Sequence, residues 1–139
     1  MANPDLEMIL MRQLASHLAM PILIVDPNGD LIYFNEAAEP ILGRRFDETG
    51  PIRRGEWTKM FKPVDDQGAP LRRENQPLFL ATTQRRPSHQ TSWIEGLDGV
   101  RRHIEGIAFP LLGQGGRMIG AAGIFWETGK QWASSAPEK

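Results

Sequence analysis

The sequence predicts an α+β domain, with one five-stranded antiparallel sheet that carries helices on one face and an N-terminal amphipathic helix in front of it. Two observations lead to this prediction. Two apolar runs of strand length come early and three more come late, and each group is broken by turn residues. The helical segments cluster between the second and third runs. At 139 residues, the chain is one domain in size and can bury a core without disulfides.

The first predicted element is an amphipathic helix over Asn3–Leu18. Asn3 suits the N-cap and Pro4 suits the first helical position. Leucines repeat every four residues along one side, at Leu6, Leu10, Leu14 and Leu18, and Met8 and Met11 widen the stripe. A stripe this wide can pack against the core of its own domain or against a second copy of the chain, and the sequence does not choose between these two possibilities. We predict a dimer interface that uses Leu6, Leu10 and Leu14.

A β-hairpin and a short helix follow. The runs "PILIVD" and "DLIYFN" are joined by "DPNGD", whose Pro-Asn-Gly triplet is strong turn chemistry. Asn35 is the predicted N-cap of the helix in "EAAEPILG", and Gly43 ends it. Pro40 lies inside this helix, so the helix is short or kinked.

The middle of the chain, 44–70, is irregular, with one short helix predicted in "EWTKMF" at 56–61. A longer helix is predicted over 73–86, which Pro87 ends. Three strands close the domain, in "HQTSWIEGL", "VRRHIEGIAFPLL" and "RMIGAAGIFWE". The predicted organisation is a helical cap at 1–19, the main domain at 20–128 and a flexible tail at 129–139, from which Trp132 packs back.

Small residues gather in the last two strands. Ile104, Gly106 and Ala108 share one face of the fourth strand, while Gly120 and Ala122 share a face of the fifth with Met118, Ile124 and Trp126. Because interiors are densely packed, either a helix approaches these residues closely or a ligand fills the space. The predicted apolar pocket is lined by Phe34, Trp57, Met60, Phe61, Leu78, Ile104, Gly106, Ala108 and Ile124.

Composition limits the chemistry. The absence of cysteine excludes disulfides and cysteine-bound metals, and no metal site or catalytic residue is assigned. The formal net charge of −1 implies no polyanionic partner. The five adjacent arginine pairs either form a solvated surface or converge beside the pocket, where they can hold a carboxylate or phosphate. No aromatic residues interleave with them, so nucleic acid is not an expected partner. No apolar run spans a bilayer, and a cytoplasmic protein without membrane partners is expected.

The order of elements resembles a PAS domain. The likeness covers 20–127 and is carried by "IVDPNGDLIYFNEAAEPILG", "DG" at 98–99, "FPL" and "GGRMIGAAGIFWE". It implies a cavity between sheet and helices, and a role in sensing, signal transduction or transcription regulation. Some family members bind haem, flavin, metabolites or fatty acids, and others only dimerise. Where sensors of the family end in Asp-x-Thr, this chain reads "FWETGKQW", which alters the coupling residues.

The resemblance also sets cofactor expectations. Haem-binding relatives use a histidine on the long helix, whereas His17, His89 and His103 lie elsewhere, so haem is not expected. Flavin photochemistry of the light-oxygen-voltage type needs a cysteine and is excluded. Ordinary flavin binding has no support in the sequence, and no cofactor is required.

We therefore expect a non-enzymatic sensory module that binds a small apolar ligand and relays it through a homodimer or an effector protein in trans. Because the chain ends soon after the last strand, it is either a stand-alone module or an excised piece. One alternative is a ligand-free dimerisation or adaptor domain. A lesser one is an enzyme resembling ketosteroid isomerases, which needs an acid and a hydrogen-bond donor in one cavity. The single tyrosine, Tyr33, is predicted to face away from Phe34 and the pocket.

Overall fold

The structure, a computed structural model, describes residues 4–132. Its helices and strands follow one another along the chain as α1 (Pro4–Ser16), β1 (Ile22–Val25), β2 (Leu31–Phe34), α2 (Glu39–Leu42), α3 (Phe46–Thr49), α4 (Arg54–Phe61), α5 (Pro77–Gln84), β3 (Ser88–Glu95), β4 (Arg101–Leu112) and β5 (Met118–Glu127). Three short 3-10 turns lie at Glu36–Ala38, Arg73–Asn75 and Gln114–Gly116. The predicted cap at Asn3 falls outside the described residues.

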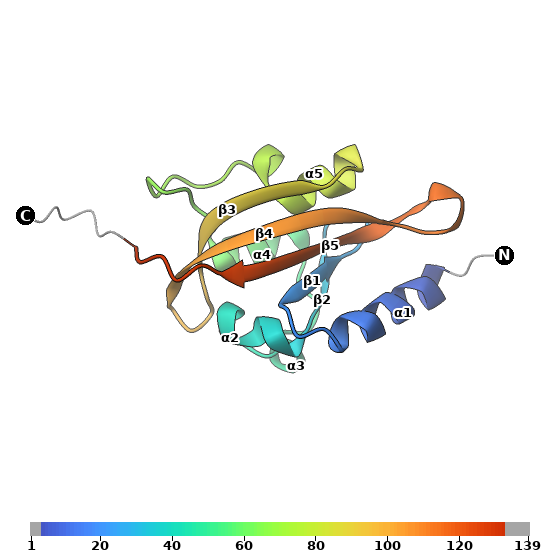
Figure 1. The fold of residues 1–139 in the computed structure, drawn as a ribbon, viewed down its shortest axis with the longest axis horizontal. Coiled ribbons are helices and arrows are strands. Elements are labelled where there is room, and N and C mark those ends of the chain that lie inside the picture. The colour runs from blue at the N-terminus through green and yellow to red at the C-terminus, as the bar shows by residue number, and fades with distance from the viewer. Residues whose placement is uncertain (1–3, 133–139) are drawn as a thin grey trace, which may run out of the picture.

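The five strands form one antiparallel sheet in the order β2-β1-β5-β4-β3, which confirms the predicted fold class. The last strand lies in the middle of the sheet, where it pairs with both β1 and β4. Figure 1 shows the three long strands side by side, with α4 and α5 together behind them and α1 beside β1 and β2. The central strand β5 therefore contacts both α5 and α1.

Local chemistry explains the hairpin and the short helix. In the β1–β2 turn, the Asp26 carboxylate accepts hydrogen bonds from the backbone N–H groups of Asn28 and Asp30, at 2.9 and 3.0 Å. Asn35 caps the following turn as predicted, because its side-chain oxygen accepts from the Ala38 N–H. Gly43 ends α2 with φ of +81°, a conformation that glycine adopts without strain.

The helix predicted over 73–86 is two elements in the structure. A 3-10 turn at Arg73–Asn75 comes first, and α5 begins only at Pro77. Gln76 between them is extended, with φ of −80° and ψ of 134°. The proline ring disfavours helical geometry at the preceding residue, so Pro77 starts a helix here instead of lying inside one.

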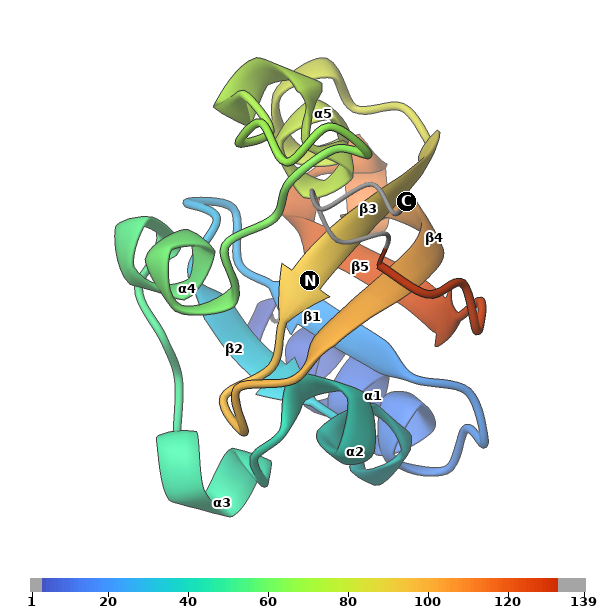
Figure 2. The same cartoon turned by 90° about the vertical axis from the view of Figure 1, so that its left-hand side faces the viewer.

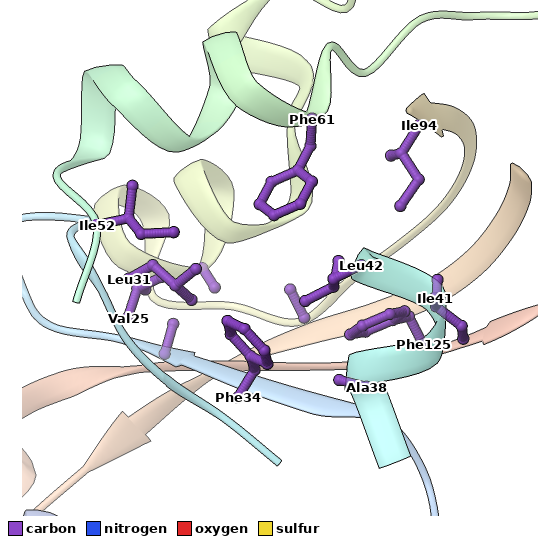
Figure 3. Close-up of a cluster of buried hydrophobic side chains, with 13 residues drawn as sticks. Val25, Leu31, Phe34, Ala38, Ile41, Leu42, Ile52, Phe61, Ile94 and Phe125 are labelled. Atoms are coloured by element: carbon purple, nitrogen blue, oxygen red, sulfur yellow. The ribbon is translucent and has the colours of Figure 1, made fainter. Parts of the chain in front are cut away.

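The sheet has a separate apolar cluster on each face. Val25, Phe34 and Phe125 belong to the cluster under α2 to α5, and Figure 3 shows Phe61 pointing from α4 toward this side of the sheet. The neighbouring positions Ile24 and Ala122 belong to the other cluster, against which α1 packs. Alternation along β1 and β5 separates the clusters, and we call these two sides the pocket face and the α1 face.

Candidate functional site

A pocket of about 130 Å³ lies on the pocket face, between the sheet and helices α4 and α5. In Figure 2, turned by 90° from Figure 1, α4 lies to the left of strands β3 to β5 and α5 lies above them. The lining is almost entirely apolar and comes from sheet, helices and the loops between them: Leu23, Leu31, Leu42, Trp57, Phe61, Pro63, Leu71, Gln76, Pro77, Leu78, Gln90, Ser92, Ile94, Ile104, Gly106, Ile107, Ala108, Gly123, Ile124 and Phe125. Such a pocket suits a small apolar ligand.

Small residues on two adjacent strands leave this space open. Ala108 on β4 pairs with Gly123 on β5, and Gly106 pairs with Phe125 one step along the ladder. A Cβ added to Gly123 would lie 3.6 Å from the Leu78 Cδ2 atom, an ordinary contact. The helix therefore does not press on the sheet at Gly123, and larger side chains at Ala108 and Gly123 would fill the pocket. A Cβ at Gly106 would instead lie 3.0 Å from the Ile124 carbonyl oxygen and 3.1 Å from the Phe125 Cβ atom, so this glycine permits close approach of β5.

Of the nine predicted lining residues, seven border the pocket: Trp57, Phe61, Leu78, Ile104, Gly106, Ala108 and Ile124. Phe34 and Met60 pack in the cluster on the same face, outside the pocket wall. Ile124 differs from the others, since it packs against the cluster on the α1 face while Gly123 and Phe125 occupy the pocket-face positions.

The other two small residues, Gly120 and Ala122, serve the α1 face. Ala122 is fully buried in the cluster under α1. At Gly120, an added Cβ would lie 2.3 Å from the Val25 carbonyl oxygen and 3.4 Å from the Met8 Cε atom. The small-residue patch thus has two roles, because one face admits a closely packed helix and the other leaves a pocket.

The pocket lining also includes three polar side chains that were not predicted from the sequence. Gln90 and Ser92 come from β3, and Gln76 precedes α5. Period-2 alternation of "QTSWI" places Gln90 and Ser92 on one face with Ile94, so a signal was present in the sequence. Gln76 already donates a hydrogen bond from Nε2 to the Leu71 carbonyl oxygen, at 3.3 Å. A few polar groups of this kind orient a ligand in an apolar pocket.

Within residues 4–132, no charged residue lines the pocket. The buried polar or charged residues of this part of the chain, Asn35 and His103, are outside the pocket lining. The isomerase-like alternative requires a carboxyl group in the cavity, which the described lining does not supply. Tyr33 packs on the α1 face under the guanidinium of Arg12, and burial raises the pKa of its phenol while Arg12 lowers it. Tyr33 therefore faces away from the pocket, as predicted.

The three histidines lie away from the pocket. His17 is exposed and its Nδ1 lies 2.7 Å from the Gln13 carbonyl oxygen, while His89 pairs with Glu105 across exposed strands. His103 is buried beside Trp93, with ring centroids 4.7 Å apart. In the described part of the chain, no group of three or more His, Asp or Glu side chains is arranged to hold a metal.

Helix α1 divides its apolar residues between two sides. Met8, Met11 and Ala15 pack against the α1 face of the sheet. The predicted interface residues Leu6, Leu10 and Leu14 are exposed by 51%, 54% and 57%, and Ile9 by 52%. Contiguous exposed leucines of this kind commonly mark an interaction surface. Among the described helices, none is long and apolar enough to cross a bilayer.

The segment after β5 folds back on the sheet. Thr128 donates its backbone N–H to the His103 carbonyl oxygen, and its hydroxyl lies 2.7 Å from the His103 Nδ1 atom. Trp132 packs edge-on against Trp93, at 4.9 Å, under the guanidinium of Arg101. Trp132 thus packs back as predicted, while 133–139 lie outside the described residues.

This strand order, with helices and a pocket on one face of the sheet, defines a five-stranded antiparallel α+β domain. A family profile for the PAS domain matches residues 10–83, just over half of the chain, so the chain belongs to the PAS domain family. Members of this family generally act as sensory modules.

Solved structures support the same fold. The PAS domain of a Colwellia psychrerythraea protein is 18% identical, with a TM-score of 0.61, and the match covers 86% of this chain and 95% of that one. The Rhodobacter sphaeroides LOV protein is 11% identical, with a TM-score of 0.69 and coverage of 89% and 68%. The PAS domain of nitrogen regulation protein NR(II) from Vibrio parahaemolyticus is 18% identical, with a TM-score of 0.56 and coverage of 85% and 97%. These identities show the fold alone, and no curated protein sequence matches the chain.

Proposed function

We propose that the protein is a sensory PAS module whose pocket binds a small apolar ligand and whose α1 surface relays the binding to a second copy or an effector protein in trans. The observation that carries this proposal is the apolar pocket held open by Ala108 and Gly123 on adjacent strands. Dense packing without a ligand would favour larger side chains than Ala108 and Gly123 opposite the two helices.

The pocket also sets the size of the ligand. An apolar cavity of about 150 Å³ accommodates benzene, so a pocket of about 130 Å³ suits a group of roughly six heavy atoms. Pockets for drug-sized ligands run to about 300 Å³ and more, which disfavours a flavin wholly inside this one. Flavin photochemistry through a cysteinyl adduct has no nucleophile in this chain. The proposed ligand is therefore a small apolar group and not a resident cofactor.

Ligand binding is tested first on the purified protein. Native mass spectrometry is expected to reveal a bound small molecule, or a panel of small apolar compounds is expected to raise the melting temperature. The variant Ala108→Leu fills the pocket from the sheet and is expected to lose both effects. A clean apo mass with no thermal shift across the panel contradicts the ligand function.

A second candidate, dimerisation or adaptor function without a ligand, is favoured by the exposed leucines of α1. The variant Leu10→Glu puts a charge in the middle of this surface and is expected to convert a dimer to a monomer in light scattering. Gln13→Glu is the matched control, because it adds the same charge at an exposed polar position of α1. If parent and Leu10→Glu are both monomers, the α1 surface does not mediate self-association.

A further inference from the structure

A second hollow lies next to the pocket. It is a groove of about 330 Å³ between the β1–β2 turn, the first turn of α4, and α5. Trp57, Gln76 and Leu78 line both the groove and the pocket, so the two hollows meet at these three side chains. The Trp57 indole N–H donates to the Gly29 carbonyl oxygen at 3.0 Å, which holds the indole in place. Gln76 and Leu78 form the α5 side of the boundary between pocket and groove, and the Gln76 side chain donates to the Leu71 carbonyl oxygen rather than to the β1–β2 turn.

The two hollows differ in polarity. The described pocket lining carries no charge, whereas the groove lining includes one charged side chain, Arg54, together with polar groups from Asn28, Thr58 and Thr82. No carboxylate belongs to the described groove lining. The lining therefore favours an anion in the groove and an apolar group in the pocket.

Arg54 lines the groove from the first turn of α4. Its stem lies over the turn, with Cδ 3.0 Å from where a Cβ on Gly29 would be. Its backbone N–H donates to the Asp30 carboxylate at 2.9 Å, and the Asp26 carboxylate accepts from backbone N–H groups of the turn. Both carboxylates of the turn thus accept hydrogen bonds from backbone N–H groups, and within residues 4–132 no ion pair includes Arg54.

We infer that pocket and groove form one site for an amphipathic carboxylate, with an apolar ring or short chain in the pocket and the carboxylate beside Arg54. A carboxylate inside the uncharged pocket would lose its hydration without a charged partner, so the head group belongs in the groove. A guanidinium matches a carboxylate with two parallel N–H donors. This inference rests on the proposed ligand function and specifies its chemical class.

Three probes of graded chemistry test the inference on the full chain. Toluene fits the pocket alone, 4-phenylbutanol adds a chain with a neutral end, and 4-phenylbutyrate has the same ring and chain with a carboxylate. In isothermal titration calorimetry, 4-phenylbutyrate is expected to bind about fivefold tighter than 4-phenylbutanol, the gain of one exposed charge pair. Raising the ionic strength is expected to reduce this difference, because salt screens the pair.

Adjacent arginines provide a matched pair of variants. Arg54→Gln is expected to abolish the preference for 4-phenylbutyrate and to leave 4-phenylbutanol unchanged. Arg53→Gln removes the same charge from an exposed residue outside the groove lining and is expected to keep the preference. Both substitutions are on the surface, so both variants are expected to fold.

The outcomes separate this inference from the proposed function. Equal affinity for the acid and the alcohol, or loss of the preference in Arg53→Gln as well, overturns the carboxylate site while leaving the pocket as a ligand site. Binding of toluene without binding of either longer probe shows that the hollows do not form one site. If toluene also fails to bind, the proposed ligand function falls together with the inference.

Discussion

Replacing Asn35 by alanine is expected to destabilise the protein and to loosen α1. Asn35 is fully buried, and its side-chain oxygen accepts from the N–H groups of Ile22 and Ala38, each at 3.1 Å. Its amide donates to the carbonyl oxygens of Ala15 and Met20, at 3.0 and 2.9 Å. One side chain thus joins the end of α1, the start of β1 and the turn before α2.

The magnitude follows from the groups left behind. Loss of the N-cap costs about 1 kcal/mol, and a buried N–H without a partner, here that of Ile22, costs about 1–3 kcal/mol. The Ala15 carbonyl still accepts from the Leu18 N–H, so it adds little. The sum is about 3 kcal/mol, and at about 3 °C per kcal/mol for a chain of this length the melting temperature falls by about 10 °C.

Urea denaturation followed by circular dichroism measures the change in free energy of unfolding for Asn35→Ala. Asn28→Ala, at an exposed position of the β1–β2 turn, is the control and is expected to change it by less than about 0.5 kcal/mol. Hydrogen exchange of Asn35→Ala is expected to rise in α1 and β1 more than in α5. An Asn35→Ala variant as stable as Asn28→Ala would refute the role of this amide as the joint between α1 and the sheet.

Three further predictions concern packing and charge. Gly120→Ala is expected to cost about 2 kcal/mol or more in urea denaturation, because the new Cβ meets the Val25 carbonyl, and an unchanged midpoint would contradict that contact. Hydrogen bonds from Arg102 lower the pKa of Asp98 from its ordinary 3.8 to about 2, so the stability from this pair is complete above pH 4 and is lost as pH falls toward 2. Asp98→Asn is expected to show a smaller loss of stability over that pH range than the parent, and equal losses would exclude the pair as the cause. Trp132→Ala is expected to speed proteolysis of the C-terminal segment, and identical cleavage rates would show that its packing does not hold the segment.

The sequence predicted what local chemistry determines. Turn residues, the cap at Asn35 and the stop at Gly43 act within a few residues of themselves, and each is in place. The break before Pro77 also follows from local chemistry, because a proline restricts the conformation of the preceding residue, although the helical pattern over 73–86 continues across it.

The faces of β5 were harder to predict because they depend on register. Alternation shows which residues of one strand share a face, but only the pairing of Ala108 with Gly123 shows which face of β5 meets the pocket. The ladder is also irregular between Leu111 and Leu112, opposite the start of β5. For this reason the sequence grouped Ile124 with residues of the pocket face, whereas in the structure it borders the pocket while packing against the cluster on the α1 face.

Which side of α1 packs on the sheet could not be predicted from the sequence for a similar reason. The leucine stripe is the more apolar side of this helix, yet the methionines and Ala15 face the sheet and the leucines are exposed. Hydrophobic periodicity locates an apolar side without saying what covers it. The groove that contains Arg54 could not be predicted from the sequence either, since it joins residues from the β1–β2 turn, α4 and α5.

Methyl NMR of the protein during titration with toluene tests the central claim, a ligand pocket on one face of the sheet, most directly. The account predicts shifts for methyl groups on the pocket face, such as Leu23, Leu78 and Ile104, and unchanged signals for Ile22 and Ile24 on the α1 face. Signals that stay constant on both faces, or that shift equally on both, would contradict it.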